Sequence, residues 1–205
     1  MTIRIIRSIV QYQNNREYNK EESIMVYILL AEGFEEIEAI TPIDLLRRVD
    51  VEVKAVSLSN VLNVKGGHGI EVMADITLEQ IDFEALEMLI LPGGLGGVCK
   101  ISDTPAAMEL IMKVWKAEKN LAAICAAPTL LARLDIIKGL SVVCHPSVSG
   151  EIMNSGGRLL HNKQVASDGN LITGKAAGSS TEFALELIAV MRGSEMSEQI
   201  RRAIT

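Results

Sequence analysis

The 205-residue sequence is poor in aromatic residues, in cysteine and in long apolar runs. Only 3% of its residues are aromatic, so the 48% that are hydrophobic must build a core mainly from Leu, Ile, Val, Ala and Met. No apolar run approaches the length of a membrane span. The three cysteines, Cys99, Cys125 and Cys144, lack the spacing of a metal site or a disulfide framework, which indicates a reducing, cytoplasmic location.

Positive charge is also scarce. The chain has 20 Lys and Arg against 26 Asp and Glu, a formal net charge of −6. Proteins that bind nucleic acid through phosphate contacts need the opposite balance, so we expect no specific nucleic-acid partner. The length suits one α/β domain with a substantial core.

Residues 1–24 differ in composition from the rest of the chain. Thr2–Val10 is basic and apolar, and Gln11–Glu22 is a polar run. Neither an uninterrupted apolar signal region nor a small-residue cleavage site is present. We expect a poorly ordered appendage at 1–24 and a single domain over 25–205.

From Met25 onward, short apolar strands alternate with helices. This alternation predicts an α/β domain whose mainly parallel sheet is covered by helices on both faces. Two further β pieces are expected, a ribbon within 61–75 and a hairpin within 164–173. The main strands are expected at 26–30, 51–58, 88–91, 121–124 and 140–144.

Cys125 falls where a strand turns into a helix. Leu121–Ile124 is a short apolar run typical of a buried parallel strand, and Pro128 suits the first turn of a helix. The unpaired N–H groups and the positive dipole end of such a helix favour a thiolate, the nucleophilic form of cysteine. The alternative, a small buried hydrophobic residue, stays open on this stretch alone.

Other strand ends also carry functional groups. Glu35, Glu36 and Glu38 follow the first strand, Gly93–Gly94 follows Leu91, and His145 follows the strand that ends at 144. Parallel strands end at one edge of a sheet, so we expect carboxylate, backbone N–H donors, thiol and imidazole to meet there. Acyl and carbonyl chemistry requires this set.

The glycine run Gly93–Gly97 is a near miss for a dinucleotide-binding loop. It lacks the third glycine of that motif, and the next helix is expected only from about residue 104. We therefore expect no nucleotide cofactor. No metal site is expected either.

Five stretches of the sequence together resemble the ThiJ/PfpI superfamily. They read AEGFEEIEAITPIDLLRR, LILPGG, AAICAAPTLLA, VVCHPS and ASDGNLITGKAAGSSTEFALELI. The chain is similar, over 25 to about 200, to the branch of the Parkinson-disease-associated deglycase and its bacterial relatives. The resemblance implies a flavodoxin-like three-layer sandwich and a homodimer with the Glu38 and Cys125 pockets near its interface.

The resemblance also implies roles for individual residues. Cys125 would be the nucleophile, Glu38 the acid hydrogen-bonded to its sulfur, His145 the nearby imidazole, Asp44 the acid that orients it, Gly94 and Ala126 the backbone oxyanion hole, and Glu35 and Gly93 supporting residues. The sequence departs from the branch at Ala127, where a glycine is usual, and at His68, where the human-like branch has an interface arginine.

The implied activity is that of a cofactor-independent glyoxalase or deglycase. Cys125 would attack the aldehyde of methylglyoxal or glyoxal to form a hemithioacetal, and a protonated Glu38 would move a proton. Hydrolysis would yield lactate or glycolate, and early adducts on amines and thiols are alternative substrates. A second hypothesis is an oxidative-stress sensor or redox-regulated chaperone that uses the same cysteine.

A cysteine peptidase or amidase is the least favoured hypothesis. An amidotransferase needs a His-x-Glu pair after the nucleophile, but the later histidines stand in HPS at 145 and HNK at 161. The peptidase branch usually has a histidine directly after the cysteine, where this sequence has Ala126.

Overall fold

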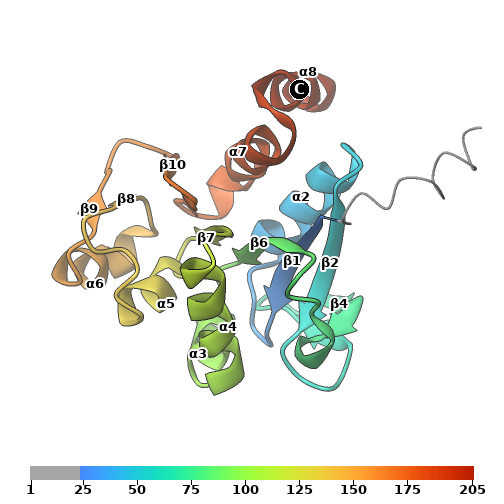
Figure 1. The fold of residues 1–205 in the computed structure, drawn as a ribbon, viewed down its shortest axis with the longest axis horizontal. Coiled ribbons are helices and arrows are strands. Elements are labelled where there is room, and N and C mark those ends of the chain that lie inside the picture. Colours follow the sequence, from blue (N-terminus) through green and yellow to red (C-terminus); the bar gives the residue numbers. More distant parts are fainter. Residues whose placement is uncertain (1–23) are drawn as a thin grey trace, which may run out of the picture.

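A central seven-stranded sheet organises the protein (Figure 1). The structure, a computed structural model, describes residues 24–205, so the predicted appendage at 1–24 lies almost entirely outside the described residues. The strand order is β10-β11-β7-β6-β1-β2-β5, and every neighbouring pair except β10–β11 is parallel. The strands are β1 (Met25–Leu30), β2 (Glu52–Ser57), β5 (Ile76–Thr77), β6 (Leu86–Leu91), β7 (Asn120–Ile124), β10 (Val165–Asp168) and β11 (Leu171–Gly174).

Helices cover both faces of this sheet. One face packs against α2 (Glu36–Arg47) and α7 (Ser180–Arg192), with α8 (Ser194–Ile204) against α7. The other face packs against α3 (Leu95–Ser102), α4 (Pro105–Lys116) and α5 (Pro128–Arg133) (Figure 1). The predicted flavodoxin-like α/β sandwich with a mainly parallel sheet is confirmed.

Strand β1 shows why the sheet is central. All six residues of its sequence MVYILL are buried. Tyr27 and Leu29 belong to the core under α3–α5, whereas Val26 and Ile28 belong to the core under α2 and α7. A continuous apolar run of this kind is what a strand covered on both faces requires.

The remaining strands form two small sheets. The predicted ribbon is the antiparallel pair β3 (Asn63–Lys65) and β4 (Glu71–Met73). The strand expected at 140–144 is reduced to β8 (Ser141–Val142), which pairs with β9 (Arg158–Leu159) outside the central sheet. It has no place beside β7, because β11 occupies that edge in parallel register, with Ile172 opposite Ala122.

A helix begins directly after the glycine loop, contrary to the expectation that the next helix starts at about residue 104. Helix α3 starts at Leu95, even though Gly96 and Gly97 are poor helix formers. A Cβ atom at Gly97 would lie 3.0 Å from the backbone of Phe34, and one at Gly33 would lie 3.0 Å from Gly96. These glycines let α3 and the turn after β1 approach backbone to backbone.

Candidate active site

Cys125 lies at the tight turn between β7 and α5. Its φ angle is +66°, in the left-handed region that residues other than glycine rarely adopt. Two hydrogen bonds hold this conformation: the Cys125 N–H donates to the Gly174 carbonyl at 3.0 Å, and the His145 N–H donates to the Cys125 carbonyl at 2.8 Å. A strained strand-to-helix turn that presents its side chain is the geometry of a nucleophile elbow.

Glu38 comes from the first turn of α2, and its side chain is completely buried. Its Oε2 accepts a hydrogen bond from the Gly93 N–H at 2.8 Å. Its Oε1 has no hydrogen-bond partner within residues 24–205, although the carboxyl group lies beside the Cys125 thiol. Buried carboxyl groups are normally fully hydrogen-bonded, so this oxygen without a partner makes Glu38 a candidate for proton transfer.

Gly93 makes the approach of these two side chains possible. A Cβ atom at residue 93 would collide with the Glu38 carboxyl oxygen and would lie 2.7 Å from the Cys125 Cβ atom. Any side chain at this position would therefore separate the acid from the thiol.

Burial raises the pKa of both side chains, and the Glu38 carboxylate raises the pKa of the Cys125 thiol further. Burial raises the pKa of Glu38 to about 7, against the hydrogen bonds from Cys125 and Gly93 that lower it. Burial, together with the negative charge and hydrogen bonding of Glu38, raises the pKa of Cys125 to about 12. The prediction that the Cys125 thiol ionises readily is therefore wrong for the resting state of this pair. Over the range between these pKa values, the pair holds a single proton, and it sits on the sulfur.

Two backbone N–H groups face the sulfur from opposite turns. Gly94, whose φ angle is +85°, belongs to the turn before α3, and Ala126 follows the elbow. Both lower the pKa of Cys125 by hydrogen bonding to its sulfur. The structure thus brings together the two predicted oxyanion donors, whose catalytic role stays a prediction.

His145 contacts the elbow through its backbone N–H, whereas its ring hydrogen-bonds to Ser147, two residues further along the chain. The ring Nδ1 lies 2.7 Å from the Ser147 hydroxyl and accepts from the Ser147 N–H at 3.2 Å. Asp44 does not orient this ring within the chain. Its carboxylate binds Arg48 at 3.0 Å, one helical turn further along α2, and about half of its side chain is exposed. The expected role of Asp44 in orienting His145 stays a prediction.

The matching family model covers residues 24–190 of this chain and is described as the DJ-1/PfpI family. The chain belongs to the DJ-1/PfpI family. Curated relatives include the Parkinson disease protein 7 homolog of Danio rerio, 33% identical over 176 residues, which span 85% of this chain and 93% of the relative. Protein dj-1beta of Drosophila melanogaster is 32% identical over 177 residues, 86% of this chain and 94% of the relative.

Solved structures agree with this assignment. The crystal structure of Drosophila melanogaster DJ-1beta matches with a TM-score of 0.84 and 31% identity, over 89% of this chain and 97% of that one. One curated relative carries an activity in its name: the glutathione-independent glyoxalase DJR-1.2 of Caenorhabditis elegans. It is 30% identical over 177 residues, 86% of this chain and 93% of the relative.

The sequence did not reveal a second carboxylate cluster beside this family site. Glu36 is buried, and its carboxylate accepts hydrogen bonds from the His68 N–H at 2.7 Å and from the Ile70 N–H at 3.4 Å, with the His68 Nδ1 at 2.8 Å. Although burial opposes it, these hydrogen bonds lower the pKa of Glu36, and the hydrogen bond to Glu36 raises the pKa of His68. Glu35 adds a carboxylate oxygen 3.7 Å from the His68 ring.

This cluster fastens the β3–β4 ribbon to the start of α2. Glu35, Glu36 and His68 place ligand-type atoms within 4.8 Å of one another. The Glu36 oxygens are already occupied by N–H donors, so the cluster is a hydrogen-bonded anchor. The glycine pair at 66–67 was the available sequence signal, because a Cβ atom at Gly66 would collide with the Glu36 carboxylate.

Proposed function

We propose that the protein is a cofactor-independent enzyme of the glyoxalase or deglycase type. Its substrates would be methylglyoxal, glyoxal or their early adducts, and Cys125 would be the nucleophile. The observation that carries this proposal is the buried Glu38 carboxyl group, with a pKa of about 7, beside the thiol at a strained elbow. The glyoxalase name of the Caenorhabditis elegans relative supports the reaction class.

The first step would couple proton transfer to attack. As the Cys125 sulfur forms a bond to the aldehyde carbon of methylglyoxal, its proton moves to the Glu38 carboxylate, and the carbonyl electron pair moves onto oxygen. The Gly94 and Ala126 N–H groups face the sulfur and are placed to stabilise the negative oxygen. The oxygen then takes a proton, which gives a neutral hemithioacetal.

The later steps would move hydrogen within the substrate. Glu38, deprotonated again once it has given its proton to the hemithioacetal oxygen, takes the proton from the aldehyde-derived carbon and returns it to the neighbouring carbon. The hemithioacetal hydroxyl proton passes to the ketone oxygen, so that the aldehyde-derived carbon becomes the thioester carbonyl and the ketone becomes an alcohol. The product is a thioester of lactate on Cys125. Water cleaves this thioester, releases lactate and returns a proton to the sulfur. Methylglyoxal and water thus give lactate with no external oxidant or reductant.

Lactate formation from methylglyoxal tests the proposal. Cys125→Ala should abolish turnover, whereas Cys99→Ala should keep it, because Cys99 is exposed on α3, outside the site. All proteins must be free of contaminating glyoxalases. Absence of lactate from folded, reduced wild-type protein, or its persistence in Cys125→Ala, would contradict the proposal. Parallel assays with glycated amines and thiols compare the deglycase reaction.

A redox-sensor role is the second candidate. A protonated Glu38 can donate a hydrogen bond to an oxidised Cys125, and the two backbone N–H groups can bind a sulfinate oxygen. One structural neighbour, Toxoplasma gondii DJ-1, was solved in a form described as oxidized, at 27% identity and a TM-score of 0.82 over 88% of this chain and 97% of that one. Peroxide should then add two oxygens to Cys125 in folded protein, and earlier oxidation of Cys99 would argue against a sensor.

The predicted homodimer also remains a proposal. Ile37 and Ile40 on α2 and Ile70 and Met73 near β4 are exposed apolar side chains, and Ile40 and Met73 line one shallow cavity. A second copy would cover them. Light scattering with Ile40→Lys as the variant tests this, and a monomeric wild type contradicts it.

Within residues 24–205, no helix is long and apolar enough to cross a membrane. The cytoplasmic location stays a prediction.

A further inference from the structure

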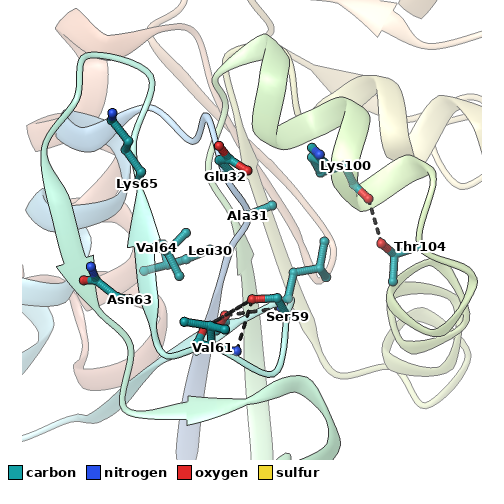
Figure 2. A pocket seen from close by; sticks show the side chains of 12 residues that line it. Leu30, Ala31, Glu32, Ser59, Val61, Asn63, Val64, Lys65, Lys100 and Thr104 are labelled. Atoms are coloured by element: carbon teal, nitrogen blue, oxygen red, sulfur yellow. Dashed lines mark hydrogen bonds between the residues drawn. The ribbon is translucent and has the colours of Figure 1, made fainter.

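A cavity of about 460 Å³ lies beside the turn after β1, and none of the proposed site residues lines it. It opens at the carboxyl ends of β1 and β2, between the β3 strand and α3 (Figure 2). Ligands of parallel sheets bind at this edge, and cavities of several hundred Å³ hold small molecules. No step of the proposed reaction uses this cavity.

The charged residues of the cavity have no partners of their own. Lys65 comes from β3, Lys100 from α3 and Glu32 from the turn after β1, and all three are exposed. Within the described part of the chain, none of their side-chain charges forms an ion pair or a hydrogen bond. These three are the charged residues of the lining, and together they give it a local formal charge of one positive unit.

The rest of the lining is mixed. The floor is apolar, with Leu30, Ala31 and Val64, and polar groups stand on the walls, among them Ser59 and Asn63 (Figure 2). A molecule with an apolar carbon skeleton and a charged end matches this lining. Polar groups at a few positions then fix its orientation.

The walls are held in place without a ligand. The Ser57 hydroxyl, fully buried, donates to the Val61 carbonyl at 2.6 Å and so fixes the loop after β2. The Gly33 N–H donates to the Lys65 carbonyl at 2.8 Å, and the Thr104 hydroxyl donates to the Lys100 carbonyl at 2.8 Å. Both lysines therefore stand on backbone that is ordered before binding, which lowers the entropic cost of binding.

We propose that this cavity binds a small organic anion, with Lys65 and Lys100 contacting its carboxylate or phosphate group. The negative charge of Glu32 repels an anion, so binding depends on the two positive charges of Lys65 and Lys100. The site is separate from the proposed reaction of Cys125, so its presence or absence does not depend on that reaction.

Amide chemical shifts in the full-length protein test this site. The probes are succinate and glycerol 3-phosphate, which separate carboxylate from phosphate recognition, with glycerol as the neutral control. At least one anion should shift the amides of Ser59, Lys65 and Lys100 saturably, while glycerol does not. Absence of a saturable shift for both anions, or an equal response to glycerol, would overturn the proposal.

Charge variants decide which groups bind. The double variant Lys65→Gln with Lys100→Gln should weaken binding about tenfold or more, because it removes both positive charges that contact the anion. Glu32→Gln should strengthen it, because a negative charge is removed. The matched control changes two exposed, unpaired lysines elsewhere, Lys116→Gln with Lys163→Gln, and should leave binding unchanged. Equal weakening in the control pair would mean that net charge alone attracts the probe, and would overturn the proposed site.

Discussion

The Gly93 N–H donates a hydrogen bond to the Glu38 carboxylate at 2.8 Å, and the missing side chain of Gly93 leaves the space in which Glu38 meets Cys125. Gly93 thus supplies both the hydrogen-bond donor for Glu38 and the space for its contact with Cys125. The position of the acid is fixed from a neighbouring strand end, independently of the elbow.

Gly93→Ala should disrupt this arrangement. The added methyl group would push Glu38 away from Cys125, so lactate formation should fall at least about tenfold, and overpacking should cost about 1–3 kcal/mol in the free energy of unfolding. Turnover assays and denaturant unfolding measure both effects. Gly150→Ala is the control, because a Cβ atom there meets nothing within 4 Å. Wild-type turnover in Gly93→Ala would show that the close approach is not needed.

Glu38→Gln should remove the proton acceptor while keeping the size of the side chain. General acid–base groups contribute about 10²–10⁴-fold to rate, so turnover should fall by that range. The pKa of the Cys125 thiol should also fall below its value of about 12, because the carboxylate charge that raises it is gone. Iodoacetamide reactivity against pH measures that shift. Glu109→Gln, on the exposed face of α4, is the control. Near wild-type turnover in Glu38→Gln would exclude Glu38 from the mechanism.

The raised pKa of Glu38 predicts how unfolding depends on pH. The folded protein holds this proton up to about pH 7, whereas the ordinary pKa of a glutamate in an unfolded chain is 4.5. Between these values the folded state binds more protons, so stability falls as pH rises, by about 3 kcal/mol at most. The unfolding free energy should decrease from pH 5 to pH 8, and Glu38→Gln should lack this part of the decrease. An unchanged pH dependence in the variant would contradict the raised pKa.

The Glu36–His68 contact predicts a measurable titration. Because the hydrogen bond to Glu36 raises the pKa of His68, the ring should titrate above its ordinary value of 6.5. Proton NMR of the imidazole measures this pKa in the wild type and in Glu36→Gln, where it should fall back toward 6.5. The stability from the raised pKa of His68 is lost as pH rises through its folded pKa, and the stability from the lowered pKa of Glu36 is lost as pH falls through its folded pKa, so the pair stabilises most between these values. Equal titration curves for the two proteins would contradict the pairing.

Backbone strain at the elbow predicts an order of stabilities. A residue other than glycine at φ +66° costs about 1–2 kcal/mol, so Cys125→Gly should be more stable than Cys125→Ala by about 1 kcal/mol. Denaturant unfolding of the two variants measures the difference. Ala126→Gly, at a residue without a positive φ, should instead be destabilising. A Cys125→Gly variant less stable than Cys125→Ala would show that the turn is not strained.

The sequence predicted much of the architecture but not the interactions that set the charges. Apolar runs located the strands of the central sheet apart from the two-residue edge strand β5, and strand ends located Cys125, Glu38 and Gly93, because both depend on local pattern. The helix that begins at Leu95 was missed, since the close packing of glycine backbones, a tertiary effect, overrides helix propensity.

The same limit applies to the site. The pKa of Cys125 depends on how deeply its sulfur is buried and on the charge of Glu38, neither of which a strand–turn–helix pattern reports. The Glu36–His68 contact joins residues 32 positions apart in sequence. Asp44 was assigned by resemblance alone, and its place beside Arg48 follows from helix periodicity, which brings residues four apart together.

The hydrogen bond from the Cys125 N–H to the Gly174 carbonyl links the elbow to the last strand of the sheet, β11. A chain emerging from the ribosome carries its cysteine long before β11 exists. Until β11 inserts between β7 and β10, the carbonyl that holds the left-handed turn is absent. Fragments that end before β11 therefore lack this support for the left-handed turn at Cys125, and the elbow is complete only when the whole sheet has formed.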